Sequence, residues 1–148
     1  MLFRSEEYYC TLCYATFDFK RRTVVLANSG LPYPLRCRGT HNRDAVHAPA
    51  QIELAGVPLG SFAGSTYDEQ SFELAVGDLY VFCTDGISEA ADSLGTEFGS
   101  GRLAEVVSAS RYKTAREIVD DIFAAVQEFR SDASAVDDMT AVAVRITA

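Results

Sequence analysis

The sequence predicts an α+β protein in which antiparallel strands come first, helices follow, and one more strand closes the chain. Short apolar segments separated by turn residues occupy the first part of the chain, and helical periodicity appears only after residue 85. The final segment alternates again in the manner of a strand. With 148 residues, 48% of them hydrophobic, and no repeat or linker, we expect a single domain with one core.

The first part of the chain is expected to contain strands joined by turns. Tyr8–Phe19 is rich in Tyr, Phe, Thr and Cys, and the polar residues Lys20-Arg21-Arg22 separate it from Thr23–Ala27, which predicts a hairpin. Breaks are expected in a variable loop from Thr40 to Ala50 and in the turn Gly56–Gly60. Further strands are predicted at Tyr33–Cys37, Phe72–Leu74 and Leu79–Cys83.

Helices are predicted in the second part of the chain, a short one over Ile87–Ala91 and another over Arg102–Ala109. The strongest helical signal comes third, because Thr114 and Glu117 have the spacing of a capping box. One face of this helix should cover a sheet, and it carries Ile118, Ile122, Ala125 and Phe129.

The last predicted strand is Thr140–Thr147, after a loop over Ser131–Val136. Alternation places Val142, Val144 and Ile146 on one side of this strand and Ala141, Ala143 and Arg145 on the other.

The charge of the chain excludes several classes of partner. The net charge is −8 and the isoelectric point is near 4.7, which disfavours attraction to nucleic acid or to an anionic membrane. The first residues lack a basic segment followed by an apolar one, and no run approaches the roughly 18 apolar residues of a membrane span. We therefore expect a cytoplasmic protein with no nucleic acid and no membrane as partner.

The cysteines and histidines give no catalytic or zinc-binding pattern. Cysteines lie in apolar strand-like segments, which favours buried thiols in a reducing compartment over disulfides. The Cys-x-x-Cys pair has no second pair to complete a zinc site, and both histidines are expected to be solvated in a polar loop. These residues are Cys10, Cys13, Cys37, Cys83, His41 and His47.

Two segments that contain aspartate form the candidate functional site. The apolar run that ends at Cys83 continues into Thr84-Asp85-Gly86, and Asp137-Asp138-Met139-Thr140 opens the last strand. A strand that ends in a carboxylate beside one that begins with a carboxylate can place two oxygen ligands at one sheet edge, as Mg²⁺ or Mn²⁺ requires. Taken alone, each segment is more often an ordinary turn or a solvated loop.

Five motifs in order give the chain a family resemblance. They are Thr11–Asp18, Ala27–Leu35, Gly56–Gly60, Thr84–Ala90 and Asp137–Thr140. With them the chain resembles the PPM-type metal-dependent protein serine/threonine phosphatases, specifically their SpoIIE/RsbU-like branch. The resemblance implies an antiparallel β-sandwich flanked by helices, dependence on Mg²⁺ or Mn²⁺, and a phosphorylated regulatory protein of the anti-sigma-factor antagonist type as substrate.

The resemblance also implies roles for individual residues. Asp85 and Asp137 correspond to metal ligands of the family, whose cations activate a water molecule and neutralise phosphoryl oxygens. Gly86 is expected to let the backbone turn tightly beside Asp85, and Asp138 and Thr140 to orient Asp137 through hydrogen bonds. Glu89 is expected to cap or switch the helix that follows Asp85.

Two departures from the family qualify this interpretation. The family begins its active site with a Gly-Asp-x-x-Gly segment, and nothing before Tyr8 matches it, so residues 1–148 correspond to the C-terminal portion of the domain. We therefore expect the chain alone to be inactive, and its uncovered strand edges to favour a homodimer or a complex with another polypeptide. In addition, Leu31 occupies the position of a family histidine. A noncatalytic binding module of the same fold, or a purely structural half-domain, remains an alternative.

Overall fold

The computed structural model describes residues 9–39, 48–131 and 137–147. These residues form two compact units. Among the described residues, one unit comprises 9–33 and 53–74, and the other comprises 34–39, 48–52, 75–131 and 137–147. Each unit contains its own antiparallel sheet, and the expected α+β class is confirmed.

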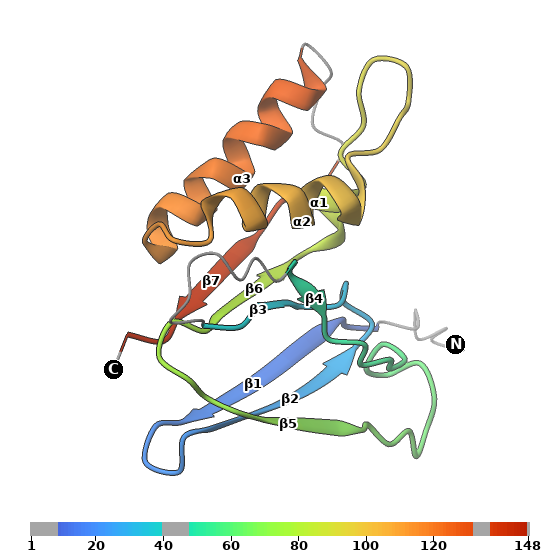
Figure 1. Ribbon diagram of the computed structural model, residues 1–148. Coiled ribbons are helices and arrows are strands. Elements are labelled where there is room, and N and C mark those ends of the chain that lie inside the picture. The colour runs from blue at the N-terminus through green and yellow to red at the C-terminus, as the bar shows by residue number, and fades with distance from the viewer. Residues whose placement is uncertain (1–8, 40–47, 132–136, 148) are drawn as a thin grey trace, which may run out of the picture. The chain divides into compact units, whose positions relative to one another are not determined.

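The sheet of the first unit has three strands in the order β1-β2-β5, which are Leu12–Asp18, Thr23–Ser29 and Glu69–Glu73 (Figure 1). The predicted hairpin is confirmed, because β1 pairs antiparallel with β2 from Leu12 opposite Ser29 to Asp18 opposite Thr23. Asp18 stabilises the turn, since its Oδ1 accepts hydrogen bonds from the backbone N–H groups of Lys20 and Arg21 at 3.0 and 2.9 Å. Within residues 9–11, the part before Leu12 that the structure describes, Cys10 forms an isolated bridge to Leu59.

Close backbone packing shapes the rest of this unit. Asn28 is buried, and its Nδ2 donates to the carbonyl oxygens of Leu31 and Leu54 at 2.8 and 3.0 Å. A Cβ atom on Gly56 would lie 2.0 Å from the carbonyl oxygen of Asn28, so only glycine fits there. The Gly56–Gly60 segment is thereby held against β2.

The sheet of the second unit has four strands in the order β4-β3-β6-β7 (Figure 1). Their bounds are Ala50–Gln51, Leu35–Cys37, Leu79–Cys83 and Ala141–Arg145. The strand β3 begins later than predicted because Pro34 has no backbone N–H to donate to a neighbouring strand. The strand β4 lies at the end of the predicted Thr40–Ala50 loop, most of which falls outside the described residues.

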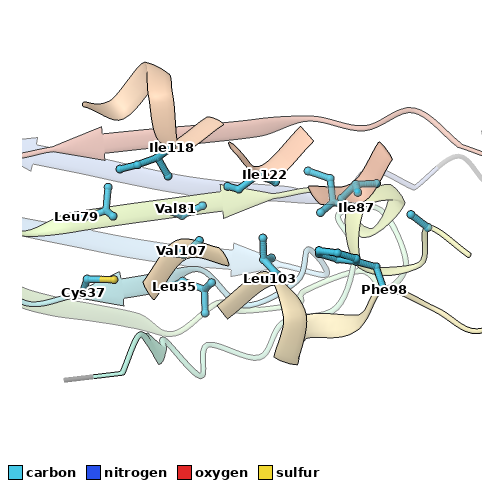
Figure 2. Close-up of a cluster of buried hydrophobic side chains, with 12 residues drawn as sticks. Leu35, Cys37, Leu79, Val81, Ile87, Phe98, Leu103, Val107, Ile118 and Ile122 are labelled. Carbon is cyan, nitrogen blue, oxygen red and sulfur yellow. The ribbon is translucent and has the colours of Figure 1, made fainter. Parts of the chain in front are cut away.

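The described residues of this unit form the helices α1 (Asp85–Ser88), α2 (Gly99–Ser110) and α3 (Ala115–Arg130). Buried side chains of the helices and of β3 and β6 form one core cluster, so the predicted covering of a sheet by the third helix is confirmed (Figure 2). Ala125 and Phe129 pack only partly buried against this cluster. Its members include Leu35, Leu79, Val81, Ile87, Phe98, Leu103, Val107, Ile118, Ile122 and Val126.

The bounds of the first two helices differ from the prediction: α1 ends at Ser88 instead of Ala91, and α2 is longer at both ends than the predicted Arg102–Ala109. The capping box of α3 is confirmed, since Thr114 Oγ1 accepts from the N–H of Glu117 and Glu117 Oε2 accepts from the N–H of Thr114. The first helix begins at Asp85 instead of Ile87, because the N–H of Glu89 bonds to the carbonyl oxygen of Asp85 and closes the turn there.

The last strand, β7, shows the predicted alternation, and the structure shows which of its two faces packs against the core. Ala141 and Ala143 pack against the core cluster, whereas Val142 is 49% exposed on the other face. Small side chains on the inner face allow helix α3 to lie close to β7.

Asp78 fixes the start of β6 and therefore its register. This carboxylate is fully buried and accepts hydrogen bonds from Arg36 Nη2 at 3.0 Å, from the N–H of Gly39 at 2.7 Å and from the N–H of Ala75 at 3.2 Å. Its backbone carbonyl accepts from the N–H of Ile146 at 2.9 Å. With one end of the β6–β7 pair held in this way, the opposite ends of the two strands come together at Thr84 and Thr140.

The cysteines are all free, as predicted, but they are not all buried. Cys37 is buried, Cys13 and Cys83 are partly buried, and Cys10 is exposed, because it lies outside the sheets at the isolated bridge to Leu59. The expectation of a buried thiol is therefore wrong for Cys10. Burial raises the pKa of the Cys83 thiol to about 12.

No helix in the described part of the chain is long and apolar enough to cross a bilayer.

Candidate metal centre

The pairing of β6 with β7 brings the two aspartate segments side by side. The last regular pair is Cys83 with Ala141, and the next residues along the strands are Thr84 and Thr140. The N–H of Thr84 donates to the carbonyl oxygen of Thr140 at 3.0 Å. In return, the N–H of Thr140 donates to the side-chain Oγ1 of Thr84 at 2.9 Å.

Thr84 has a role that the sequence reasoning missed. Its Oγ1 also donates to the carbonyl oxygen of Asp138 at 3.4 Å, while its own carbonyl accepts from the N–H of Ile87 at 3.2 Å. Thr84 is the N-cap residue of α1, yet its side chain makes no capping hydrogen bond to that helix. The available signal was a hydroxyl-bearing β-branched residue between a strand end and an Asp-Gly pair.

Gly86 lies directly against the Asp137–Thr140 segment. A Cβ atom at this position would be 2.3 Å from the carbonyl oxygen of Asp138 and 3.1 Å from its carbonyl carbon. Gly86 is not among the glycines with positive φ. The chain does turn here, from β6 into α1, but without a positive φ at Gly86. The structure adds a second reason for glycine, which is the room that the neighbouring backbone of Asp138 needs.

Asp85 and Asp137 share the same local arrangement. Both side chains are exposed, and the Oδ1 of each accepts a hydrogen bond from the backbone N–H of the next residue, at 3.0 Å for Gly86 and 2.8 Å for Asp138. Within the described residues no hydrogen bond reaches the Oδ2 atom of either aspartate. Each carboxylate is thus oriented through one oxygen and can offer the other to a cation.

The other predicted residues act through their backbones. The N–H of Asp138 holds Asp137, and its carbonyl faces Thr84 and Gly86. Thr140 contributes its N–H and its carbonyl oxygen to Thr84. Glu89 is the exposed C-cap residue of α1 and bonds to the carbonyl oxygen of Asp85 through its N–H at 2.8 Å.

The residues present fit a hard divalent cation in ligand type but supply only part of a site. Exposed carboxylates are the ligands that Mg²⁺ and Mn²⁺ prefer. Such cations take about six oxygen ligands, and no cluster of three or more His, Cys, Asp or Glu side chains able to hold a metal occurs within residues 9–39, 48–131 and 137–147. The remaining ligands would have to come from water or from groups outside this part of the chain.

Comparison with a protein-family model settles the family. The model of stage II sporulation protein E (SpoIIE) matches residues 2–147. The chain belongs to the SpoIIE family. In a comparison with curated protein sequences, none matches the chain significantly.

Solved structures show that the SpoIIE-family fold of this chain is that of a PP2C phosphatase domain. The SiaA-PP2C domain of Pseudomonas aeruginosa matches with a TM-score of 0.79 and 20% identity over 92% of this chain and 51% of its own. The SpoIIE phosphatase domain of Bacillus subtilis, presoaked with manganese, matches with a TM-score of 0.72 and 24% identity over 97% and 59%.

A third match extends the comparison to the RsbU type. The structure of the RsbU and RsbW domains of Rv1364c from Mycobacterium tuberculosis matches with a TM-score of 0.69 and 22% identity, over 93% of this chain and 36% of that one. The chain thus spans between about one third and three fifths of the solved chains named here. The predicted resemblance to the SpoIIE/RsbU-like branch is confirmed.

Proposed function

We propose that this chain is part of a Mg²⁺- or Mn²⁺-dependent protein phosphatase domain that hydrolyses phosphoserine or phosphothreonine. Asp85 and Asp137 are its proposed metal ligands. The observation that carries this proposal is the hydrogen bonding of Thr84 to Asp138 and Thr140, which joins the two aspartate segments in a family of phosphatases. A relative of the same fold was presoaked with manganese.

The proposed substrate is a phosphorylated regulatory protein of the anti-sigma-factor antagonist type, acting in the cytoplasm. Support comes from the family match and from the RsbU-type structural relative, whose chain also contains an RsbW domain. The acidic character of the chain, with a net charge of −8, fits a protein substrate better than nucleic acid.

Manganese binding tests the metal site. We expect titration calorimetry to detect weak Mn²⁺ binding to the chain, and Asp85→Asn and Asp137→Asn each to lower the affinity about tenfold or more, because each removes a charged oxygen ligand. Asp68→Asn, at an exposed position of the first unit, is the control and should leave the affinity unchanged. Equal affinities in all four proteins would contradict the proposed ligands.

Hydrolysis separates the two functional alternatives. A noncatalytic binding module is the second candidate, because the described residues offer no cluster of three metal-binding side chains. In a protein that also contains the N-terminal portion of the domain, manganese-dependent release of phosphate from p-nitrophenyl phosphate and from a phosphoserine peptide, lost in Asp85→Asn, would establish the enzyme. Binding of the phosphopeptide without phosphate release by that protein would favour the binding module.

A further inference from the structure

We infer that Thr84 is a positioning residue, whose hydroxyl holds the Asp137–Thr140 segment against Asp85 and Gly86. The inference concerns the backbone of the site and deepens the proposed function. Only the predicted effect of Thr84 on manganese binding rests on the proposed function.

The hydroxyl of Thr84 replaces a backbone carbonyl in the last rung of the β6–β7 pair. In a regular hydrogen-bonded antiparallel pair, two opposite residues exchange both N–H···O=C bonds. Here the N–H of Thr84 makes its bond to Thr140, but the carbonyl of Thr84 has turned into α1 and accepts from Ile87. Thr84 Oγ1 takes its place and accepts from the N–H of Thr140 at 2.9 Å.

Because the hydroxyl accepts this hydrogen bond in place of the carbonyl, the chain can leave β6 at Thr84 while Thr140 stays bonded to it. The backbone can enter α1 at Asp85 while Thr140 keeps a full hydrogen-bonding partner. Of the three hydrogen bonds that join Thr84 to the second segment, two use the hydroxyl. Loss of the hydroxyl would therefore leave one bond between Thr84 and the residues that follow Asp137.

The local structure gives the hydroxyl no other purpose. A threonine at an N-cap normally accepts a hydrogen bond from the second or third residue of its helix. Thr84 makes no such bond, and its side chain instead bonds to a segment more than 50 positions away in the sequence. A residue that lacks a favourable local interaction and makes a distant one indicates a functional or tertiary requirement.

Packing at Gly86 makes the position of the second segment sensitive to this tether. The carbonyl oxygen of Asp138 lies where a side chain of residue 86 would begin, and the same oxygen accepts from Thr84 Oγ1. The next residue back, Asp137, is held by the N–H of Asp138. Through this sequence of contacts the Thr84 hydroxyl sets where the Asp137 carboxylate stands relative to Asp85.

Amide hydrogen exchange of Thr140, followed by NMR in the metal-free chain, tests the tether directly. We expect Thr84→Val, which keeps the shape of the side chain but not the oxygen, to speed exchange at Thr140 by about tenfold. Thr84→Ala serves as a second deletion in case the valine variant fails to fold. Thr84→Ser should restore exchange to within about twofold of the unmodified chain, because the serine hydroxyl can make the same bonds.

Manganese supplies the second readout, through the paramagnetic broadening of the amide signals of Asp85–Glu89 and Asp137–Thr140. We expect Thr84→Val to lower the Mn²⁺ affinity about tenfold and Thr84→Ser to recover it, while the control Thr16→Val on β1 changes neither readout. Unchanged exchange at Thr140 in both deletion variants would overturn the tether, whatever the metal does.

The two proposals can fail separately. Faster exchange at Thr140 with an unchanged Mn²⁺ affinity would overturn the positioning role while leaving the metal ligands in place. Absence of Mn²⁺ binding to the unmodified chain would count against the proposed metal site and against positioning of its ligands, and the exchange data would still decide whether Thr84 tethers the segment.

Discussion

At two positions in the motif segments, Gly56 and Gly86, only glycine fits, because the backbone of another segment lies against the Cα atom. A side chain at Gly56 would meet the carbonyl oxygen of Asn28 at 2.0 Å, and one at Gly86 would meet that of Asp138 at 2.3 Å. Real Cβ atoms do not approach other atoms so closely. In both places the protein uses the absence of a side chain to bring two segments into contact.

The effect of a single methyl group at residue 86 follows from this geometry. We expect Gly86→Ala to destabilise the fold by about 1–3 kcal/mol, because the added Cβ pushes against a backbone oxygen that cannot rotate away. Urea denaturation measures the change. The matched control is Gly101→Ala in the first turn of α2, where nothing lies within 4 Å of an added Cβ atom, and this variant should gain up to about 1 kcal/mol. Equal stability of the two variants would refute the steric explanation.

At this scale the sequence predicts that the segments of Asp85 and Asp137 meet, but not which residues hold them together, and the role of the two aspartates as metal ligands stays a prediction. Asp85 and Asp137 could be proposed because each stands at the end of an apolar strand, and the structure does bring their segments together. The hydroxyl of Thr84 and the steric role of Gly86 depend on how two strands lie beside each other. No local pattern around residue 84 shows which distant N–H its side chain will accept from.

At the scale of elements, local signals determine which predictions succeed. Helix α3 was predicted from Thr114, Glu117 and the spacing of Ile118 and Ile122, all of which are close in sequence, and the capping box and the buried face are as expected. Short elements fared less well. The strand β4 has only Ala50 and Gln51 and exists through its pairing with Leu35 and Arg36, which the sequence of β4 does not indicate.

The cap of α3 contributes measurably to stability. Thr114→Ala removes the acceptor for the N–H of Glu117, and we expect the free energy of unfolding to fall by about 1 kcal/mol. The affected helix carries Ile118, Ile122 and Val126 into the core, so the loss should appear in global denaturation curves. A variant as stable as the unmodified chain would show that core packing alone determines the start of α3.

The same cap predicts a pH dependence with a definite sign. Hydrogen bonds from the Thr114 side chain and N–H hold the pKa of Glu117 below its ordinary value of 4.5. Because the folded state favours the ionised carboxylate, the stabilisation is present above pH 4.5 and is lost as the pH falls through the lower folded-state pKa. Glu117→Gln should therefore lose less stability than the unmodified chain on acidification. Parallel curves of melting temperature against pH for the two proteins would contradict this.

At the scale of the whole molecule, β1 is an edge strand that has no strand partner on its outer side among the described residues. The strand β1 is at the edge of its sheet and exposes Leu12 and Tyr14, at 46% and 62%. Edges of this kind are usually guarded by lysine, proline or a bulge, and β1 contains no Lys, Arg or Pro. The homodimer expected from the sequence therefore remains a prediction, with β1 as the proposed contact.

Self-association through β1 can be measured by sedimentation velocity over a range of concentrations. We expect a dimer whose dissociation constant rises about tenfold in Tyr14→Lys, because the new charge would be buried against a second copy. Phe62→Lys alters a side chain that is 69% exposed in a loop of the same unit, and it should leave the dimer unchanged. A monomer at all concentrations, or equal effects of both substitutions, would rule out β1 as the contact.

The fold class and the helical layer could be predicted from the sequence, because hydrophobic periodicity separates strands from helices and marks the inner face of α3. Contacts between residues that are distant in the sequence could not be predicted in this way. The burial of Asp78 among Arg36, Gly39 and Ala75 joins parts of the chain with no shared local pattern, although it sets the register of β6. The predicted Ser131–Val136 loop lies outside the described residues except for Ser131.

The contacts of Thr84 also bear on the order in which the protein is made and folds. Its partners Asp138 and Thr140 follow it by 54 and 56 positions, with α2 and α3 in between. Closing so long a stretch costs chain entropy, which is recovered only when the last strand docks. During synthesis Asp85 is added 52 residues before Asp137. A growing chain therefore carries Asp85 before Asp137 exists, and the proposed cation site can form only after the last strand has docked.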